Sequence, residues 1–414
     1  MRILWFTNTP SNYKISSKGY NGGGWISSLE KEIIQLKDIK LAISFELSGE
    51  PFKVEKEGVT YYPISYAKKK KIGKLFELLS NSVLNYSVEI EEYLKVINDF
   101  KPDIIEVFGS ERSFGLVAPF TSVPVVLHIQ GILNPYYNAY LPPFISWKQL
   151  KSFNPLKMLQ QYKNKKRWVN SCKRETEILK RIKYYIGRTT WDERVTKIFN
   201  PTCQYFYGSE ILREPFYFSS KRVLPAELKI VTTISSPLYK GFDLVLKTAK
   251  LMKEELGLQF IWEVFGNINP QFIEKNTGII CKSINVKLCG VAQAEEIKQK
   301  ILNCTCFFHP SYIDNSPNSV CEAQLLGCPV ISTNVGGIPS LITDNETGFL
   351  VPANDPYQAA YLIWQLYKDT VLNENIGNNA KIVAVKRHDK QEIVSSLFGI
   401  YQQIIDSNYR KKQE

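Results

Sequence analysis

The sequence predicts two doubly wound α/β domains, and three observations support this. Short apolar segments of strand length alternate with longer amphipathic segments of helix length along the whole chain. Several short segments are apolar on both faces, as parallel strands covered by helices on each side are. The length of 414 residues, 44% of them hydrophobic, exceeds one ordinary domain and suits two domains of about 200 residues each.

The first predicted domain spans residues 1–220 and opens with strand, glycine-rich loop and helix. The strand covers residues 3–7, the loop contains the glycines at 22–24, and the helix begins near Trp25. Later strands are predicted at residues 41–45, 59–64, 103–108, 123–129 and 184–186. This order predicts a first parallel sheet with its loops at one edge.

The second predicted domain, residues 221–388, repeats the pattern after a boundary near 214–228. Its strands are predicted at residues 229–234, 260–265, 286–289, 304–308, 330–332 and 349–351. Its helices are predicted at residues 242–256, 294–302, 319–326 and 357–367. The remaining segment, 389–414, reads as one amphipathic helix over 389–405 and a basic tail.

Composition narrows the class of protein. The net charge is +12, and residues 1–220 hold 32 basic against 21 acidic residues, so the excess lies in the first half. Eight cysteines without a C-x-x-C pair indicate reduced thiols in a cytoplasmic protein. No apolar segment approaches membrane-spanning length, and the N-terminus lacks a signal-peptide layout. Three scattered histidines and no D-x-D predict no metal site.

The most informative stretch is residues 309–352. A polar loop containing Asp314 follows a predicted strand, a helix begins near residue 317 or 318, and Glu322 lies one turn into it. Ligands of such folds bind at strand carboxyl ends against helix N-termini. We expect free N–H groups at the helix start to meet a phosphate or sugar hydroxyl. These N–H groups belong to Asn318, Ser319 and Val320.

This stretch resembles glycosyltransferase family 4, retaining enzymes of the GT-B fold. The resemblance rests on Asp314-x7-Glu322, Ala323, Gly327-x-Pro329-Val330, Gly336-Gly337 and Thr347-Gly348-x-x-Val351. It implies two Rossmann-like domains facing across a cleft and a final helix that crosses back to the first. It also implies that Asp314, where the family has Glu, contacts the donor sugar and that Glu322 binds the ribose. The alternative is an ordinary βαβ unit with a capping Asp.

Lys240, in the sequence LYKGFD, resembles the family's phosphate-binding lysine. A lysine at a strand-to-helix turn neutralises a diphosphate and stabilises a leaving group; the alternative is a solvated loop lysine. The family usually has an arginine just after the strand, five or six residues before this lysine, where this chain has Ile234, Ser235 and Ser236. Arg112 and Arg188 of the first domain are the candidate replacements.

Two further parts of the first domain enter the predicted site through the resemblance. Gly23 and Gly24 lie in a loop that in the family approaches the donor phosphate, although a plain turn is the alternative. Gln130 takes the position of a histidine that touches the donor sugar. His128, two residues earlier, is either a second catalytic candidate or a core histidine. The predicted catalytic set is therefore Asp314, Lys240, Gln130 and His128.

Basic residues at 68–74 and 163–183 lie beside aromatic and aliphatic ones. This composition suits the surface of an anionic membrane, and a solvated helix face is the alternative. Nucleic acid ranks lower because no recognition module accompanies the charge. We therefore expect a protein attached peripherally to the cytoplasmic face of the membrane.

The predicted function follows from the resemblance. It is metal-independent, cofactor-free transfer of a hexose from a nucleotide-sugar donor to a hydroxyl acceptor, with retention of configuration. The expected acceptor is a lipid-linked glycan in surface-polysaccharide assembly. Two alternatives stay open: a catalytically weak relative acting as a nucleotide- or membrane-binding scaffold, and another GT-B enzyme such as a sugar-nucleotide epimerase.

Overall fold

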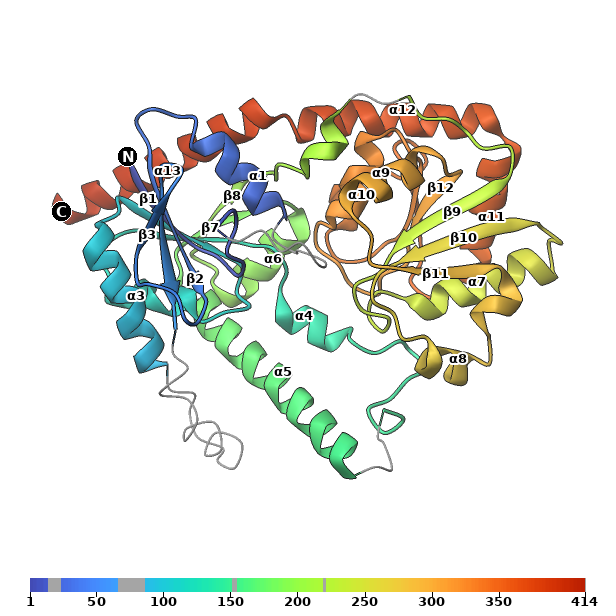
Figure 1. Cartoon of the computed structure of the whole chain (residues 1–414), viewed down its shortest axis with the longest axis horizontal. Coiled ribbons are helices and arrows are strands. Elements are labelled where there is room, and N and C mark those ends of the chain that lie inside the picture. The colour runs from blue at the N-terminus through green and yellow to red at the C-terminus, as the bar shows by residue number, and fades with distance from the viewer. Residues whose placement is uncertain (14–23, 66–85, 151–154, 219–220, 414) are drawn as a thin grey trace.

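A computed structural model describes residues 1–13, 24–65, 86–150, 155–218 and 221–413. Two sheets, one of eight strands and one of six, form two lobes side by side (Figure 1). Helices cover the faces of each sheet. The prediction of two doubly wound α/β domains is confirmed.

The N-terminal sheet has β1 near its centre, and its hydrogen-bonded neighbours are parallel apart from the β3–β4 pair. In order across the sheet, the strands are β3 (Val54–Lys56), β4 (Val59–Ile64), β2 (Lys40–Glu46), β1 (Arg2–Phe6), β5 (Ile104–Phe108), β6 (Val125–His128), β7 (Tyr184–Gly187) and β8 (Gln204–Tyr207). All five residues of β5 are buried, which explains its unbroken apolar sequence. The strand order reverses between β1 and β5, so their loops diverge there.

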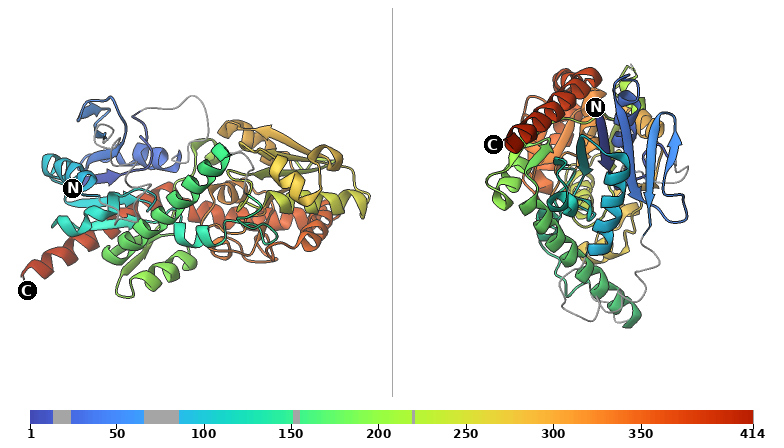
Figure 2. Two further views of the ribbon diagram at one scale, coloured as in Figure 1. Left: turned by 90° about the horizontal axis from the view of Figure 1, so that it is seen from below. Right: turned by 90° about the vertical axis from the view of Figure 1, so that its left-hand side faces the viewer.

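The described helices of this lobe differ in how closely they pack on the sheet. They are α1 (Gly24–Ile33), α3 (Ser87–Phe100), α4 (Leu133–Asn138), α5 (Pro155–Arg181) and α6 (Thr190–Phe199), with 3₁₀ turns η1 (Phe114–Phe120) and η2 (Glu214–Tyr217). Leu29 and Ile33 of α1 are buried against the sheet. The N-terminal part of α5 instead projects away from the lobe (Figures 1 and 2).

The C-terminal sheet has the strand order of a dinucleotide-binding fold. Across the sheet the strands are β11 (Val286–Gly290), β10 (Phe260–Phe265), β9 (Leu228–Thr233), β12 (Cys306–His309), β13 (Val330–Thr333) and β14 (Phe349–Val351). All neighbours are parallel. The order reverses between β9 and β12, which places the ligand crevice of this fold class at the loops after these two strands.

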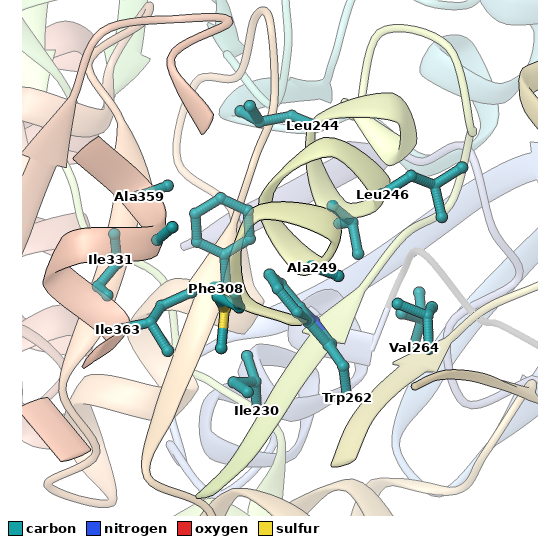
Figure 3. Packing of buried hydrophobic residues seen from close by; sticks show 14 of the residues in the cluster. Ile230, Leu244, Leu246, Ala249, Trp262, Val264, Phe308, Ile331, Ala359 and Ile363 are labelled. Carbon is teal, nitrogen blue, oxygen red and sulfur yellow. The ribbon is translucent and has the colours of Figure 1, made fainter. Parts of the chain in front are cut away.

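The helices of this lobe enclose a core around the central strands. They are α7 (Phe242–Glu254), α8 (Gln271–Thr277), α9 (Ala294–Leu302), α10 (Asn318–Leu325), α11 (Pro356–Lys368) and α12 (Thr370–Arg387), with 3₁₀ turns η3 (Cys281–Ile284) and η4 (Ile338–Ser340). Figure 3 shows Trp262 and Phe308 packed between the sheet and the flanking helices. The buried Trp262 indole satisfies its N–H by donating to Thr232 Oγ1 at 3.0 Å.

The last helix, α13 (Lys390–Gln413), crosses from the C-terminal lobe to the N-terminal lobe (Figures 1 and 2). Its apolar side chains, including Leu397 and Ile404, are buried in the N-terminal core beside Ile3 and Ile104. The predicted crossing helix is confirmed, and it is longer than the residues 389–405 predicted.

The differences from the predicted elements include a shifted strand end, two strands that were not predicted and the unpredicted helix α12. The strand predicted from residue 304 begins at Cys306, and β3 and β8 were not predicted. All eight cysteines are free in this structure. Within the described ranges, no cluster of three or more His, Cys, Asp or Glu is placed to hold a metal ion. None of the helices described there combines the length and apolarity that crossing a membrane requires.

Candidate functional site

Asp314 lies in the loop after β12, at the point where the strand order of the C-terminal sheet reverses. Its carboxylate forms an ion pair with Lys240 from the loop after β9. His309 Nε2 lies 2.9 Å from Asp314 Oδ2, and the Tyr136 hydroxyl donates to Oδ1 at 3.3 Å. Asp314 is 5% exposed. The two C-terminal loops and the N-terminal lobe therefore converge on one carboxylate.

Glycines allow these loops to approach one another. Gly241, at φ +70°, ends the loop that carries Lys240 and starts α7. A Cβ there would collide with the carbonyl oxygen of Pro310, and one on Gly336, at φ +53°, would collide with that of Asp314. Both positions combine a left-handed backbone with close backbone contact, so only glycine fits them.

The Asp314 carboxylate is held as an anion. Burial by itself would raise its pKa, but the Lys240 ammonium and the His309 contact outweigh burial and lower the pKa below its ordinary value. Burial lowers the pKa of His309, so this imidazole is neutral at pH 7. Asp314 is thus suited to accept hydrogen bonds and not to donate a proton.

Glu322 lies in the first turns of α10 and is 1% exposed. Arg213, from the segment before η2, closes over it with two hydrogen bonds: Nε to Oε1 at 2.6 Å and Nη2 to Oε2 at 2.7 Å. Burial raises the pKa of Glu322, and Arg213 opposes that rise. The pair is a bidentate, charge-assisted contact between the two halves of the chain.

The start of α10 has Pro317 at its N-cap and so lacks a side-chain cap. One expectation for this helix is wrong: the Val320 N–H is not free, because it donates to the Pro317 carbonyl at 3.0 Å. Among the described residues, the N–H groups of Asn318 and Ser319 have no hydrogen-bond partner. Two amides at a helix N-terminus beside Glu322 suit an anionic or hydroxyl-bearing ligand.

Residues of the N-terminal lobe form hydrogen bonds with the loop that leads into α10. The fully buried Asn315 donates to Asp192 Oδ2 at 2.9 Å and accepts from Thr189 Oγ1 at 2.7 Å. Ser316 Oγ donates to Glu210 Oε1 at 3.3 Å. Residues after β7 thus position the loop between Asp314 and α10, although they are far from it in the sequence.

The two arginines considered as extra phosphate ligands occupy different environments. Arg188 is buried, with Nη1 2.7 Å from Glu210 Oε2 and its guanidinium over the Trp25 ring. Arg112 is half exposed and pairs with Glu46 at 2.8 Å. The arginine that reaches an acid of the predicted pair is Arg213, to which sequence reasoning gave no role.

The remaining predicted residues are not all brought to Asp314. The Gln130 carbonyl accepts from Asn315 Nδ2 at 3.3 Å, and its buried Nε2 has no partner among the described residues. His128 is 2% exposed and bonds Glu106 through Nδ1 at 2.7 Å, in the N-terminal core. Gly24 begins α1 beside Arg213, and Gly23 lies outside the described residues.

Parts of the chain resemble known proteins. The family model described as "Glycosyl transferases group 1" matches residues 219–383. The amylovoran biosynthesis glycosyltransferase AmsK of Erwinia amylovora is 26% identical over 162 residues, 37% of this chain and 39% of AmsK. The capsular polysaccharide biosynthesis glycosyltransferase CapM of Staphylococcus aureus is 34% identical over 99 residues, 24% of this chain and 26% of CapM. The aligned parts therefore cover about a quarter to two fifths of these relatives.

The solved structure of HepE from Anabaena, in complex with UDP, matches the whole fold. Its TM-score is 0.65 at 16% identity, covering 98% of this chain and 99% of HepE. HepE has also been solved with UDP-glucose, with a TM-score of 0.63 to this chain.

Two Rossmann-like domains, a loop site between them and a helix crossing back define a protein of the GT-B class. Residues 219–383 resemble the group 1 glycosyl transferases, parts of the chain resemble glycosyltransferases of polysaccharide biosynthesis, and the fold is that of HepE.

Proposed function

We propose that this protein transfers a sugar from a nucleotide-sugar donor to a hydroxyl of a glycan or lipid-linked acceptor, with retention, in polysaccharide assembly. One observation carries the proposal: two carboxylate–cation pairs, Asp314–Lys240 and Glu322–Arg213, flank the N-terminus of α10 at the ligand crevice. The UDP and UDP-glucose complexes of HepE support the donor class, and the name of CapM supports the setting.

In the proposed complex each group has one task. Glu322 accepts hydrogen bonds from the ribose hydroxyls, and the Asn318 and Ser319 amides hold the diphosphate. Lys240 stabilises the charge that develops on the leaving diphosphate. A sugar hydroxyl takes the place of Tyr136 at Asp314 Oδ1, since the 3.3 Å contact there is long for a hydroxyl donor.

Retention in this proposal needs no protein nucleophile. The acceptor hydroxyl attacks C1 on the face that the diphosphate leaves, and the leaving phosphate oxygen takes the hydroxyl proton. Asp314 stays ionised throughout, as its lowered pKa favours. Lys240 and the N-terminus of α10 supply the positive charge, so we expect transfer to continue after metal chelation.

The test is a thermal-shift panel with UDP, GDP, ADP, CMP and dTDP and their sugars, using wild type, Glu322→Ala and Glu346→Ala. A ligand at a hundred times its dissociation constant stabilises the fold by about 2.7 kcal/mol. One nucleotide should shift wild type and the exposed-acid control Glu346→Ala, but not Glu322→Ala. Equal thermal shifts in all three proteins would contradict the proposal that Glu322 binds ribose. No shift with any nucleotide would favour the alternative in which the protein is a catalytically weak scaffold.

Transfer and epimerisation are separated by the products. With the donor identified above, a transferase forms a glycoside only when an acceptor is supplied, and NMR of the anomeric proton reports its configuration. Conversion of the donor to an epimeric sugar nucleotide without acceptor would establish the alternative chemistry. An inverted anomer would contradict retention, and loss of transfer in EDTA would contradict metal independence.

We propose a second binding function, at an anionic membrane surface, because α5 exposes apolar side chains beside its basic ones. Met158, Leu159 and Tyr162 are 51%, 49% and 61% exposed. Their spacing places them on one face of α5, next to Lys163 and Arg167. The helix projects from the lobe (Figure 1). Apolar residues inserted at the membrane interface contribute to binding, and each basic residue near the surface adds about 1 kcal/mol of binding free energy. Together they give reversible binding. The basic residues at 68–74 lie outside the described residues.

A further inference from the structure

The contact between Arg213 and Glu322 covers a carboxylate that is otherwise buried. Glu322 is 1% exposed, whereas the Arg213 side chain is one-third exposed. The guanidinium uses Nε and Nη2 to bond both carboxylate oxygens. Arg213 therefore lies between Glu322 and solvent, on the route that a hydroxyl group would take to the acid.

This arrangement creates a competition if Glu322 binds ribose. The two ribose hydroxyls need acceptor positions on the same oxygens that the guanidinium engages side-on. Removing the cation without replacement would leave a buried anion with a large desolvation cost. An anion on the ligand that bonds the displaced guanidinium would offset part of this cost.

The surroundings of Arg213 indicate which anion that is. A Cβ on Gly24 would lie 3.3 Å from Arg213 Cγ, so the arginine stem packs against the N-terminus of α1. The stem of Arg213 thus lies at the N-terminus of α1, which favours negative charge, while its guanidinium bonds Glu322 of α10. The anion that a nucleotide brings to this place is its own 5′-diphosphate, and planar guanidinium recognises phosphate in a bidentate manner.

We propose that Arg213 is a ligand-exchange residue: it covers Glu322 until ribose binds, and then transfers its hydrogen bonds to the diphosphate of the same nucleotide. The inference rests on the proposed nucleotide-sugar donor and adds how the site recognises it. A bare nucleoside has to break the Arg213–Glu322 pair and brings no anion in place of Glu322. A nucleoside diphosphate replaces the lost partner, so the site discriminates strongly between the two ligands.

The experiment measures the dissociation constants of uridine and UDP by titration calorimetry in wild type, Arg213→Gln and Arg213→Lys. The readout is the affinity ratio of UDP to uridine. We expect Arg213→Gln to reduce this ratio by at least about tenfold, since a charge-assisted hydrogen bond is lost. Uridine affinity should not fall, and Arg213→Lys should restore part of the ratio by keeping the charge.

A second variant gives effects of opposite sign. Glu322→Gln removes the anion that holds Arg213 while keeping the shape of the side chain. We expect it to bind inorganic pyrophosphate more tightly than wild type and uridine more weakly. A merely structural role of the pair would weaken both ligands together, and thermal melts show whether each variant is folded.

The outcomes separate this inference from the proposed function. An unchanged UDP-to-uridine ratio in a folded Arg213→Gln that binds UDP would overturn the exchange, as would equal weakening of both ligands. Guanosine with GDP and adenosine with ADP replace the uridine pair if wild type prefers those bases. Failure of wild type to bind any nucleoside diphosphate would overturn the proposed function itself, and the exchange with it.

Discussion

Asn315 of the C-terminal lobe donates a hydrogen bond from Nδ2 to Asp192 Oδ2 of the N-terminal lobe, at 2.9 Å. Asn315 is fully buried, and its Oδ1 accepts from Thr189. Asp192 also caps α6 with its own carboxylate, so the contact ends on a fixed element. The loop between Asp314 and α10 therefore takes its position from both lobes.

Asn315→Ala should lower both stability and donor use. The substitution removes two buried hydrogen bonds and leaves the Thr189 hydroxyl proton without its acceptor, which costs about 1–3 kcal/mol of unfolding free energy. The loosened loop should raise KM for the donor more than it lowers kcat. Urea unfolding and steady-state kinetics check this, with Asn379→Ala as the exposed control. Equal unfolding midpoints in the two variants would contradict the prediction.

Asp314→Asn should separate catalysis from nucleotide binding. The variant keeps the shape of the side chain but removes the anion paired with Lys240. We expect kcat to fall by about a hundredfold, the size expected when an electrostatic group of the site is lost. UDP should bind as well as before or more tightly, because Lys240 is released toward the diphosphate. Calorimetry with UDP beside kcat measurement tests this; weaker UDP binding would argue against it.

His388 should make the protein less stable in mild acid. Its Nδ1–H donates to the Glu210 carbonyl at 2.9 Å, and its Nε2 accepts from Arg387 at 3.0 Å, so the ring is neutral. Burial lowers the pKa of His388 to about 4, while Glu210 opposes and the Arg387 and Arg188 charges add to the shift.

The sign of the pH effect follows from these values. Below its ordinary pKa of about 6.5 the histidine takes up a proton in the unfolded state but not in the native state. Stability should therefore fall between pH 6.5 and 4, by about 3 kcal/mol at most. Urea unfolding at several pH values should show a steeper loss for wild type than for His388→Gln. Parallel curves would contradict the assignment.

Tyr401→Phe should weaken the attachment of α13 to the N-terminal lobe. The buried Tyr401 hydroxyl donates to Glu106 and accepts from Trp5 Nε1 at 3.2 Å. Its removal leaves two buried groups short of a partner, at a cost of about 1–3 kcal/mol. Tyr409→Phe changes an exposed tyrosine of the same helix and is the control. Equal melting temperatures for both variants would show that this contact contributes nothing.

Replacing the exposed apolar residues of α5 by serine should reduce binding to anionic vesicles. The apolar area that would enter the membrane interface belongs to Met158, Leu159 and Tyr162. Its loss should lower the membrane partition coefficient of the protein by about tenfold or more. Ile382→Ser with Val371→Ser removes similarly exposed side chains from α12 and is the control. Sedimentation with phosphatidylserine vesicles measures the effect, and identical sedimentation of both variants would exclude α5 as the contact.

Most of the fold was predictable because its strands are buried on both faces. The sequences of β5 and β12 are almost continuously apolar, and such segments are typical of parallel strands. β3 and β8 were not predicted because they are short and partly exposed. α12 was not predicted because asparagines and charged residues interrupt the helical spacing of its apolar residues.

The candidate site was predictable only where its residues are close in sequence. Asp314 and Glu322 lie eight residues apart on one strand–loop–helix unit, so their spacing carries a signal. Arg213 is separated from Glu322 by 109 residues and belongs to no regular spacing. Asn315 pairs with Asp192 across 123 residues. Contacts between two lobes depend on how the lobes dock, which local patterns do not encode.

The return of α13 has a consequence for the order in which the protein forms during synthesis. The N-terminal core contains Ile3 and Ile104 from early strands, but also Leu397 and Ile404 from the last helix. A ribosome therefore completes the entire C-terminal sheet before the first domain receives the side chains that close its core. The lobe made first becomes fully folded last, and until then its exposed apolar face needs protection from aggregation.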